Sequence, residues 1–516
     1  MGIVRLKFIA ALVSALIGST AAQADWYRAT SNHFIVYSDD SLEDVRDYTM
    51  RLEQFDQAIR AWHVAPQDKR GASARVTVFV VDTTNDVAKL AGHDGVAGFY
   101  RPVAGQSVAF TPRNGSGDLG ARAILFHEYT HHWMLTNWTD AALPPWFVEG
   151  FAELHATALF RGNQIIFGAV PAYRKYTIGQ MNALPMSRLL RFDPGKLSDV
   201  ERDALYRHGW ALTHYLTFDP DGRKRLAGYI GALNGGKAED PAALIGNGAN
   251  MDLKIDQYVR RPRLPSSAID LDTLSIGSIE VTKLTPAEST TMPAMIASNA
   301  GVSKKNAGDV AALARRLAAP YPDDAFAQNE LAEAEFDACE IDAAAKAACY
   351  SRAAAAADRA LAADPRSVHA LDYRGMADTA ALVKDKITDP TRWAAARQWY
   401  LRANKVATEM PQPLIAYYDS FGQANEKPTA NAQAALLYAY ALAPYDGDVR
   451  LKATRVYLAQ GKLAEARTAI TPVAYNIEER AKATYAKKVL TALNDQGADA
   501  AISVFDATPA PKDEEQ

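Results

Sequence analysis

The first hundred residues alternate between segments rich in β-branched and aromatic side chains and segments whose apolar residues recur at helical spacing. Residues 33–38 and 75–81 belong to the first kind and are predicted to be strands. Residues 41–62 belong to the second kind, and Ser41 stands where a helix N-cap is expected. A further helix is predicted from about Thr84. Strands and helices in this order indicate an α+β domain.

The next segment predicts a hairpin and then a series of helices. Strands are expected at 96–100 and 106–110, on either side of a turn that contains Pro102 and Gly105. Helices dominate from about 121 to 260, and Pro144-Pro145 marks the start of one of them near Trp146. Proline is tolerated in a first helical turn because its missing N–H would have no partner there.

The pattern changes after residue 261. Residues 262–304 are predicted to be a linker with a short hairpin and a helix that opens at Thr285. From 305 to 497, Ala-rich helices alternate with Pro-containing turns, and small residues at the helix crossings match the tetratricopeptide (TPR) pattern. Stacked helical pairs form a curved solenoid whose concave face can bind a partner, whereas a plain helical bundle would need no such role. Residues 498–516 are expected to be a C-terminal tail.

Composition places the chain among soluble multidomain proteins. It has 516 residues, of which 48% are hydrophobic and 22% charged, and this length suggests two to four domains. The formal net charge of −4 gives no electrostatic footprint for nucleic acid.

The N-terminal residues indicate export. Residues 1–24 combine a short basic region, a short apolar run and an Ala-x-Ala site that ends at Ala24, which is typical of a cleavable secretory signal peptide. A periplasmic or secreted protein is therefore expected, with no membrane span after cleavage. Export also places Cys339 and Cys349 where disulfides persist, and they flank a predicted connection between helices. A bridge between them is favoured, although spacing alone does not bring two Cα atoms within bonding range.

The chemistry is concentrated in residues 127–131, which read His-Glu-Tyr-Thr-His. On a helix, His127 and His131 lie about 40° apart on one face and can hold one metal ion. Glu128 lies about 100° round the helix, where its carboxylate can take a proton from a zinc-bound water. Two imidazoles beside a carboxylate at this spacing predict a hydrolytic zinc site.

A third ligand is expected from the helix that follows Pro144-Pro145. Glu149 comes eighteen positions after His131, and Glu153 shares its helix face. We assign Glu149 as the ligand, and Glu153 as the carboxylate that holds the ring of a ligating histidine. Gly150 would let two helices approach closely.

The segments His127-Glu128-x-x-His131 and Trp146-x-x-Glu149-Gly150-x-Ala152 resemble the gluzincin metallopeptidases, in particular the peptidase MA-like group. The resemblance covers roughly residues 30–260 and is specific over 124–156. It implies that Zn²⁺ is held by His127, His131 and Glu149, with Glu128 as general base. The expected fold is therefore an α+β zincin-like metallopeptidase domain over 25–261, followed by an all-α tetratricopeptide-like solenoid.

The chain departs from the aminopeptidase branch of this family in one respect. It has no Gly-x-Met-x-Asn block upstream, which that branch uses to hold a substrate N-terminus, so an endopeptidase is favoured over an exopeptidase.

Family members often place a Tyr or His further along the chain to stabilise the oxyanion. In this region Tyr206 is the first choice and His208 the second, although both can equally be aromatic core residues of an amphipathic helix. In this fold class an edge strand before the metal helix receives the extended substrate, so the 96–110 hairpin is either that strand or a hairpin with no ligand role.

Two functions follow from these patterns. The favoured one is an exported zinc-dependent endopeptidase that hydrolyses peptide bonds through zinc-bound water, with Glu128 as general base and a TPR-like region that binds substrate or a protein partner. The alternative is a non-catalytic envelope scaffold, or peptide-binding protein, that retains a zinc site.

Overall fold

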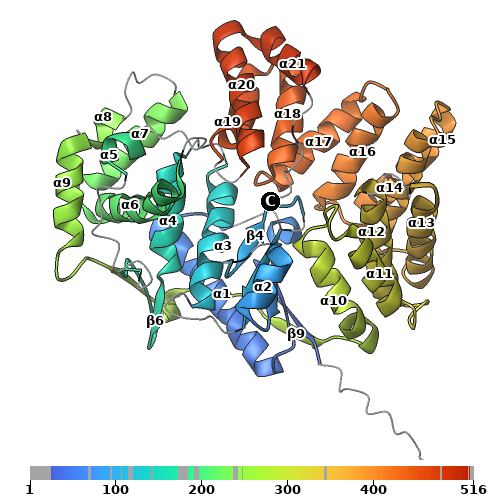
Figure 1. The fold of residues 1–516 in the computed structure, drawn as a ribbon, viewed down its shortest axis with the longest axis horizontal. Coiled ribbons are helices and arrows are strands. Elements are labelled where there is room, and N and C mark those ends of the chain that lie inside the picture. Colours follow the sequence, from blue (N-terminus) through green and yellow to red (C-terminus); the bar gives the residue numbers. More distant parts are fainter. Residues whose placement is uncertain are drawn as a thin grey trace, which may run out of the picture.

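The chain folds as a mixed α/β molecule in which helices predominate (Figure 1). The computed structural model describes residues 25–67, 71–92, 94, 96–105, 107–113, 120–139, 141, 143–171, 184–190, 197–235, 242–246, 248–341, 346–476, 479–508 and 511. The expected signal peptide, residues 1–24, lies outside the described residues. Within the described part of the chain, no helix is both long and apolar enough to span a bilayer.

A six-stranded mixed sheet lies at the centre, in the order β4-β5-β3-β2-β1-β9. Its strands are β1 (Tyr27–Thr30), β2 (Phe34–Ser38), β3 (Val76–Val81), β4 (Phe99–Arg101), β5 (Val108–Pro112) and β9 (Glu280–Lys283). β2, β3 and β5 run parallel, whereas β4, β1 and β9 are antiparallel to their neighbours. The strands predicted at 33–38 and 75–81 and the hairpin over 96–110 are confirmed, and β4 lies at one edge of the sheet.

Helices cover both faces of this sheet because successive strand residues point to opposite sides. Phe34 and Val36 pack against α1 (Leu42–His63) and α3 (Ala121–Asn137). Tyr37, from the other face, packs with residues of α10 (Pro286–Ala300); α2 (Thr84–Ala91) covers this face as well. The predicted cap at Ser41 is confirmed, since its hydroxyl accepts a hydrogen bond from the Asp44 N–H.

Two further helices follow beside α3: α4 (Pro145–Ala156) packs against α3, and α6 (Asp199–Phe218) packs against α4. They cross where Gly150 faces Gly209, so closely that a Cβ on Gly209 would lie 2.5 Å from the Trp146 carbonyl oxygen. Around them lie the short helices α5 (Met186–Leu189), α7 (Gly222–Gly235), α8 (Ala242–Ile245) and α9 (Gly248–Val259). A second sheet, in the order β6-β7-β8, contains β6 (Leu159–Arg161), β7 (Gln164–Phe167) and β8 (Ser267–Asp270).

The prediction of a hairpin within residues 262–304 is wrong. β8 pairs with β7, and β9 pairs with β1, so each strand completes a sheet of the N-terminal part of the molecule. Period-two patterning predicts a strand but does not choose its partner, because the free backbone edges of β7 and β1 compete with the local neighbour. Residues 267–270 and 280–283 therefore belong to two different sheets, and 271–279 connect them.

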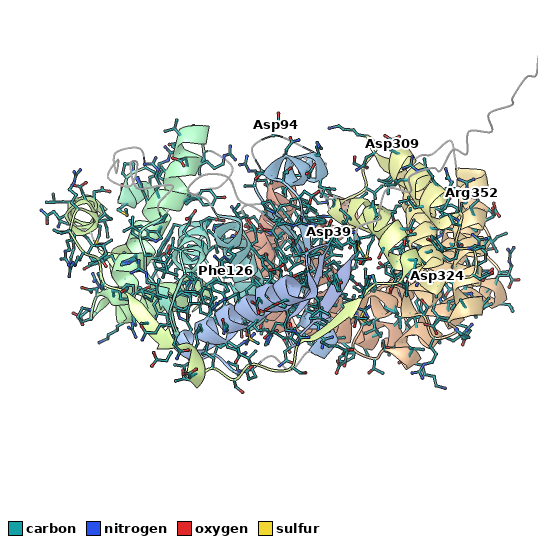
Figure 2. The ribbon with its side chains drawn as sticks, turned by 90° about the horizontal axis from the view of Figure 1, so that it is seen from below. Asp39, Asp94, Phe126, Asp309, Asp324 and Arg352 are labelled. Atoms are coloured by element: carbon teal, nitrogen blue, oxygen red, sulfur yellow. A yellow bond between two sulfur atoms is a disulfide. The ribbon has the colours of Figure 1, made fainter. Side chains whose placement is uncertain are left out.

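The remaining helices form consecutive antiparallel hairpins. They are α11 (Ala307–Ala318), α12 (Ala325–Ile341), α13 (Lys346–Ala363), α14 (Val368–Lys384), α15 (Pro390–Val406), α16 (Pro411–Gln423), α17 (Ala430–Leu442), α18 (Gly447–Ala459), α19 (Leu463–Ala474), α20 (Arg480–Gln496) and α21 (Ala498–Ala507). Figure 1 shows them as an arc that starts beside the sheet at α10 and returns to α3 at α18 and α19. In a view from below, Phe126 of α3 lies far from Asp324 and Arg352 on the outer hairpins (Figure 2).

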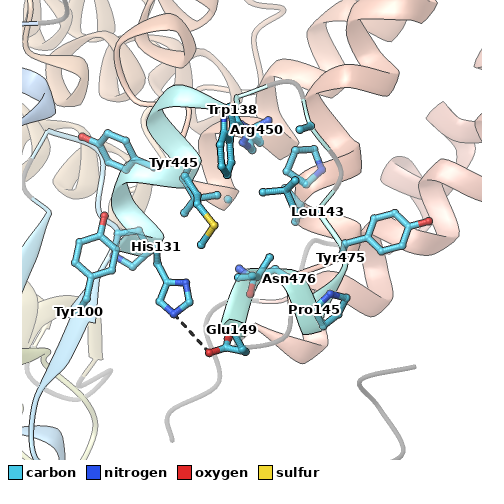
Figure 3. Close-up of a pocket in the computed structure, with 18 residues that line it drawn as sticks. Tyr100, His131, Trp138, Leu143, Pro145, Glu149, Tyr445, Arg450, Tyr475 and Asn476 are labelled. Atoms are coloured by element: carbon cyan, nitrogen blue, oxygen red, sulfur yellow. Dashed lines mark ion pairs between the residues drawn. The ribbon is translucent and has the colours of Figure 1, made fainter. Parts of the chain in front are cut away.

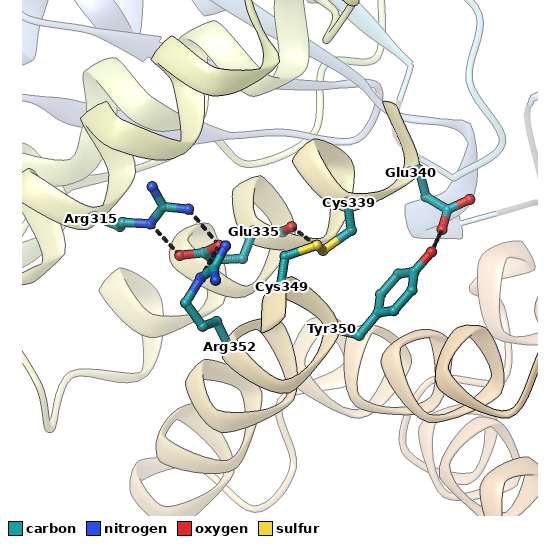
Figure 4. Close-up of a disulfide and its surroundings, with 7 residues drawn as sticks. All are labelled: Arg315, Glu335, Cys339, Glu340, Cys349, Tyr350 and Arg352. Atoms are coloured by element: carbon teal, nitrogen blue, oxygen red, sulfur yellow. Dashed lines mark hydrogen bonds and ion pairs between the residues drawn. A yellow bond between two sulfur atoms is a disulfide. The ribbon is translucent and has the colours of Figure 1, made fainter. Parts of the chain in front are cut away.

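A disulfide joins two neighbouring helices of the arc, α12 and α13. Cys339 of α12 and Cys349 of α13 are bridged across a Cα–Cα distance of 5.6 Å, as favoured from the sequence (Figure 4). Beside it, Glu335 accepts hydrogen bonds from Arg315 and Arg352. These contacts tie three successive helices together.

The tail predicted at 498–516 is shorter than expected, because residues 498–507 form α21. Ala501 is fully buried, and Phe505 packs edge-on against Tyr485 of α20. The apolar residues of this segment recur at helical spacing, and burial of that face against α20 stabilises a helix that would be marginal alone.

The arc is fastened to the N-terminal part through the turn before α18. The Tyr445 hydroxyl donates to the Ser73 carbonyl (2.7 Å), and Asp446 Oδ2 accepts from the Ala104 N–H (2.9 Å). Arg450 donates to the Thr139 carbonyl just beyond the end of α3 (2.8 Å). This turn therefore holds α18 and α19 beside α3.

Candidate metal centre

The first half of the candidate site lies on α3. His127 and His131 are one helical turn apart, and their Nε2 atoms lie 3.1 Å from each other. Both rings project between α3 and α4 with only 15% and 10% of their side chains exposed. The i, i+4 spacing thus brings both imidazoles to one point, as helical geometry requires.

The second half comes from α4, whose first helical residue is Pro145. Glu149 projects from the second turn of that helix and is 1% exposed. Its Oε2 lies 3.4 Å from His127 Nε2 and 3.7 Å from His131 Nε2 (Figure 3). His127, His131 and Glu149 therefore form a group that could hold a metal ion.

Burial favours the neutral form of His131, which is the form that can bind a metal ion. The pKa of His131 is lowered to about 4, mainly by removal from water and also by the neighbouring His127, although the carboxylates of Glu149 and Glu153 act in the opposite direction. The ring is therefore neutral at pH 7. Metal binding needs that form, because the lone pair must be free of a proton.

Two more carboxylates lie close to the group. Glu128 is half-buried and follows His127 on α3, so it is carried beside the two imidazoles and not between them. Glu153 lies one turn beyond Glu149 on α4, is 2% exposed, and is near enough to His131 to raise its pKa. Glu153 therefore lies near His131, while the catalytic role of Glu128 and the positioning role of Glu153 stay predictions.

The structure places Tyr206 and His208 in different surroundings. The Tyr206 ring lies 6.0 Å from the His127 ring, centroid to centroid, and is half-buried. His208 is fully buried on the same helix, and its Nδ1 lies 2.7 Å from the Leu184 carbonyl oxygen. Of the two candidates, Tyr206 is the one that faces the metal-binding group.

A buried polar network behind α3 was not foreseen. Tyr129, the third residue of the motif, donates from its hydroxyl to Asp56 Oδ1 (2.7 Å), while Arg60 Nε donates to Asp56 Oδ2 (2.8 Å). His33 Nδ1 lies 2.8 Å from Glu53 Oε2 and 3.4 Å from Asp56 Oδ2. These residues form a second His/carboxylate group compatible in geometry with a metal ion, but their donors and acceptors already pair with each other.

This network positions the motif helix, since Tyr129 is tied to α1 on the face opposite the metal-binding group. The sequence carried one signal for it. Glu53, Asp56 and Arg60 interrupt the apolar face of the predicted helix over 41–62, and charged residues on a buried face are retained only when they are paired.

No family model matches the chain, and no curated protein is significantly similar to it in sequence. The fold and site together define a mixed α/β protein in which the partly buried His127 and the buried His131 and Glu149 could hold a metal ion.

Proposed function

We propose that this chain is an exported zinc-dependent peptidase, acting as an endopeptidase on protein or peptide substrates. The observation that carries the proposal is the mutual distance of the three donor atoms, 3.1, 3.4 and 3.7 Å. Tetrahedral Zn²⁺ with bonds of about 2.0–2.1 Å places neighbouring ligand atoms roughly 3.3 Å apart. Two nitrogens and one carboxylate oxygen are also the donor set of hydrolytic zinc sites, which keep a fourth position open.

In this proposal His127, His131 and Glu149 hold the ion. A zinc ion so held supplies Lewis acidity and lowers the pKa of a bound water towards 7. Glu128 accepts the proton of the attacking water and passes it to the leaving nitrogen. Tyr206 donates a hydrogen bond to the developing oxyanion. Glu153 steadies the imidazole of His131, and the edge strand β4 offers its backbone to an extended substrate.

The helical hairpins over 305–497 are, on this proposal, a tetratricopeptide-like solenoid that engages substrate or a protein partner. Small residues lie at the helix crossings, as in Gly375 of α14, where a Cβ would meet the ring of Tyr400 on α15. Such hairpins stack side by side and leave one helix of each pair on the concave face.

The test combines metal content with cleavage of unfolded casein. Wild type should carry one zinc per chain and cleave casein, and Glu128→Gln should keep its zinc while losing at least about 10²-fold in rate, because only the base is removed. His127→Ala should lose both zinc and cleavage. Glu280→Gln, at an exposed strand position, serves as the matched control and should behave as wild type.

The same measurements distinguish the peptidase from the alternative, a non-catalytic scaffold that retains a zinc site. A wild type with stoichiometric zinc that cleaves no tested substrate would support a scaffold that retains a metal site. A wild type that binds no zinc would overturn the peptidase proposal.

A further inference from the structure

A pocket opens between the candidate metal centre and the helical arc (Figure 3). One wall is the face of α3 that carries His131, Met134 and Leu135, and Trp138 extends this wall just beyond the end of the helix. The metal-binding group lies at one end of the pocket and Trp138 at the other (Figure 3).

The other walls come from segments far apart in the sequence. Pro145 and Val148 of α4 contribute one wall, and Tyr445, Val473 and Tyr475 of the arc contribute another. The pocket is therefore complete only because α18 and α19 are held against α3 by the turn at Tyr445.

We propose that this pocket is a subsite that receives an apolar side chain of the polypeptide substrate, next to the bond that is hydrolysed, and that the arc thereby sets cleavage specificity. This inference rests on the proposed peptidase function. Two of the three candidate metal ligands, His131 and Glu149, line the pocket, so a side chain that fills it lies next to the reacting carbonyl.

The lining decides the chemistry of the side chain. Away from His131 and Glu149, Arg450 is the one charged side chain among the described residues that line the pocket, and it is 2% exposed. Arg450 directs its guanidinium to the carbonyls of Pro444, Ala469 and Thr139. Its donors are thus engaged within the protein, and a substrate carboxylate in the pocket would gain little from them. An unpaired charge buried there is unfavourable, whereas an aliphatic or aromatic side chain gains from leaving water.

The test measures peptide binding separately from cleavage. The probes are capped octapeptides of Gly and Ala with a single Leu, Phe, Asp or Lys at the centre, titrated calorimetrically into full-length Glu128→Gln. Leu and Phe peptides should bind about ten- to a hundredfold more tightly than Asp and Lys peptides. Cleavage sites of wild type in a peptide mixture, read by mass spectrometry, should show the same preference on one side of the cut.

Substitutions in the arc assign the preference to this pocket. Val473→Asp in the Glu128→Gln background should abolish the preference for Leu and Phe, because it places a carboxylate in the apolar wall. Tyr475→Ala, at a partly exposed position, should shift the preference towards larger side chains and keeps the test valid where Val473→Asp fails to fold. Val383→Asp, on the exposed surface of α14, is the matched control and should leave the preference intact.

The outcomes also separate the subsite from the peptidase proposal. Equal affinity for all four peptides, or a preference that both Val473→Asp and Tyr475→Ala leave unchanged, would overturn the subsite. Casein cleavage with no apolar preference would overturn the subsite while leaving the peptidase in place. Selective binding of the Leu and Phe peptides by a protein that cleaves nothing would support the pocket and overturn the peptidase.

Discussion

At the residue scale, single side chains differ in how strongly local sequence places them. His127 and His131 share a helix, so their side chains project from one face wherever α3 forms, and in the structure their Nε2 atoms lie 3.1 Å apart. Tyr206 and His208 also share a helix, but two positions apart they point to different surroundings, one towards His127 and the other towards the Leu184 carbonyl.

The distinction between these two residues is testable. Tyr206→Phe should lower kcat about 10²-fold with KM and zinc content unchanged, because a donor aimed at the transition state is lost while ground-state binding is kept. His208→Gln should lower the free energy of unfolding and leave kcat near wild type, since its ring is buried against a carbonyl. An unchanged kcat in Tyr206→Phe, measured on a peptide that wild type cleaves, would remove Tyr206 from the mechanism.

At the element scale, the site depends on how closely α4 approaches its neighbours. Gly150 faces Gly209 of α6, and a Cβ at Gly150 would clash with the Gly209 backbone. The absence of side chains at this crossing sets the position of α4, and α4 carries Glu149. Sequence identified the glycine and suggested close approach, but it did not identify α6 as the partner.

Gly150→Ala should therefore destabilise the protein by about 1–3 kcal/mol, as overpacking of a close crossing does. It should also weaken zinc binding, because α4 can relieve the clash only by moving Glu149. The control is Gly228→Ala in α7, where a Cβ has open space and alanine favours the helix by up to about 1 kcal/mol. Urea unfolding and a zinc-chelator competition would measure both effects, and equal behaviour of the two variants would contradict this account of the crossing.

The helices of the arc contain three buried titrating side chains, Glu330, His369 and Asp372, whose pKa shifts the sequence did not predict. Burial and the charge of Glu333 raise the pKa of Glu330 to about 8. Burial by itself would lower the pKa of His369, but its hydrogen bond and charge interaction with Glu333 raise it to about 9. Burial also raises the pKa of Asp372 to about 7. All three groups bind protons more tightly when folded than when unfolded, so each contributes less to stability as pH rises.

The contribution of Glu330 to stability falls as the pH rises from about 4.5, its ordinary pKa, to about 8, its pKa in the folded protein. The variant Glu330→Gln lacks this ionisation. The free energy of unfolding of the variant should therefore rise relative to that of wild type as the pH increases from 5 to 8. Below pH 4.5 the two should differ little. Asp323→Asn, at an exposed position, should show no such trend. Chemical unfolding at a series of pH values provides the measurement, and a difference that does not depend on pH would contradict the raised pKa.

At the scale of the whole molecule, the arc closes back onto the metal-binding part. The chain leaves the central sheet at α10, which packs on the sheet, and returns to α3 at Tyr445 and Arg450. The closure brings residues about 300 positions apart into one pocket. A sequence motif cannot predict such a pocket, because the segments that form the pocket walls share no local sequence pattern.

Tyr445→Phe tests the closure. The variant leaves the Ser73 carbonyl without the Tyr445 hydroxyl in a buried setting, which should lower the free energy of unfolding by about 1–3 kcal/mol. Tyr438→Phe, at a position that is 47% exposed, should have no measurable effect. Urea midpoints of the two variants compare them directly; a Tyr445→Phe midpoint equal to that of wild type would show that this contact does not fasten the arc.

The sequence by itself determined what depends on neighbours along the chain. These features include the histidine pair of the motif, the proline start of α4, the cap at Ser41, and the Pro-containing turns between the helices of the arc. Each follows from helical periodicity or from backbone groups within a few residues.

Only the tertiary structure decided which distant surfaces meet. It brought Glu149 to within 3.7 Å of both histidines, paired β8 and β9 with separate sheets, turned residues 498–507 into a packed helix, and set the arc against α3. The physical reason is that packing between elements depends on complementary surfaces and free backbone edges across the whole molecule. Several surfaces and strand edges compete to pair with any one element, and their separation along the chain does not decide which of them pairs.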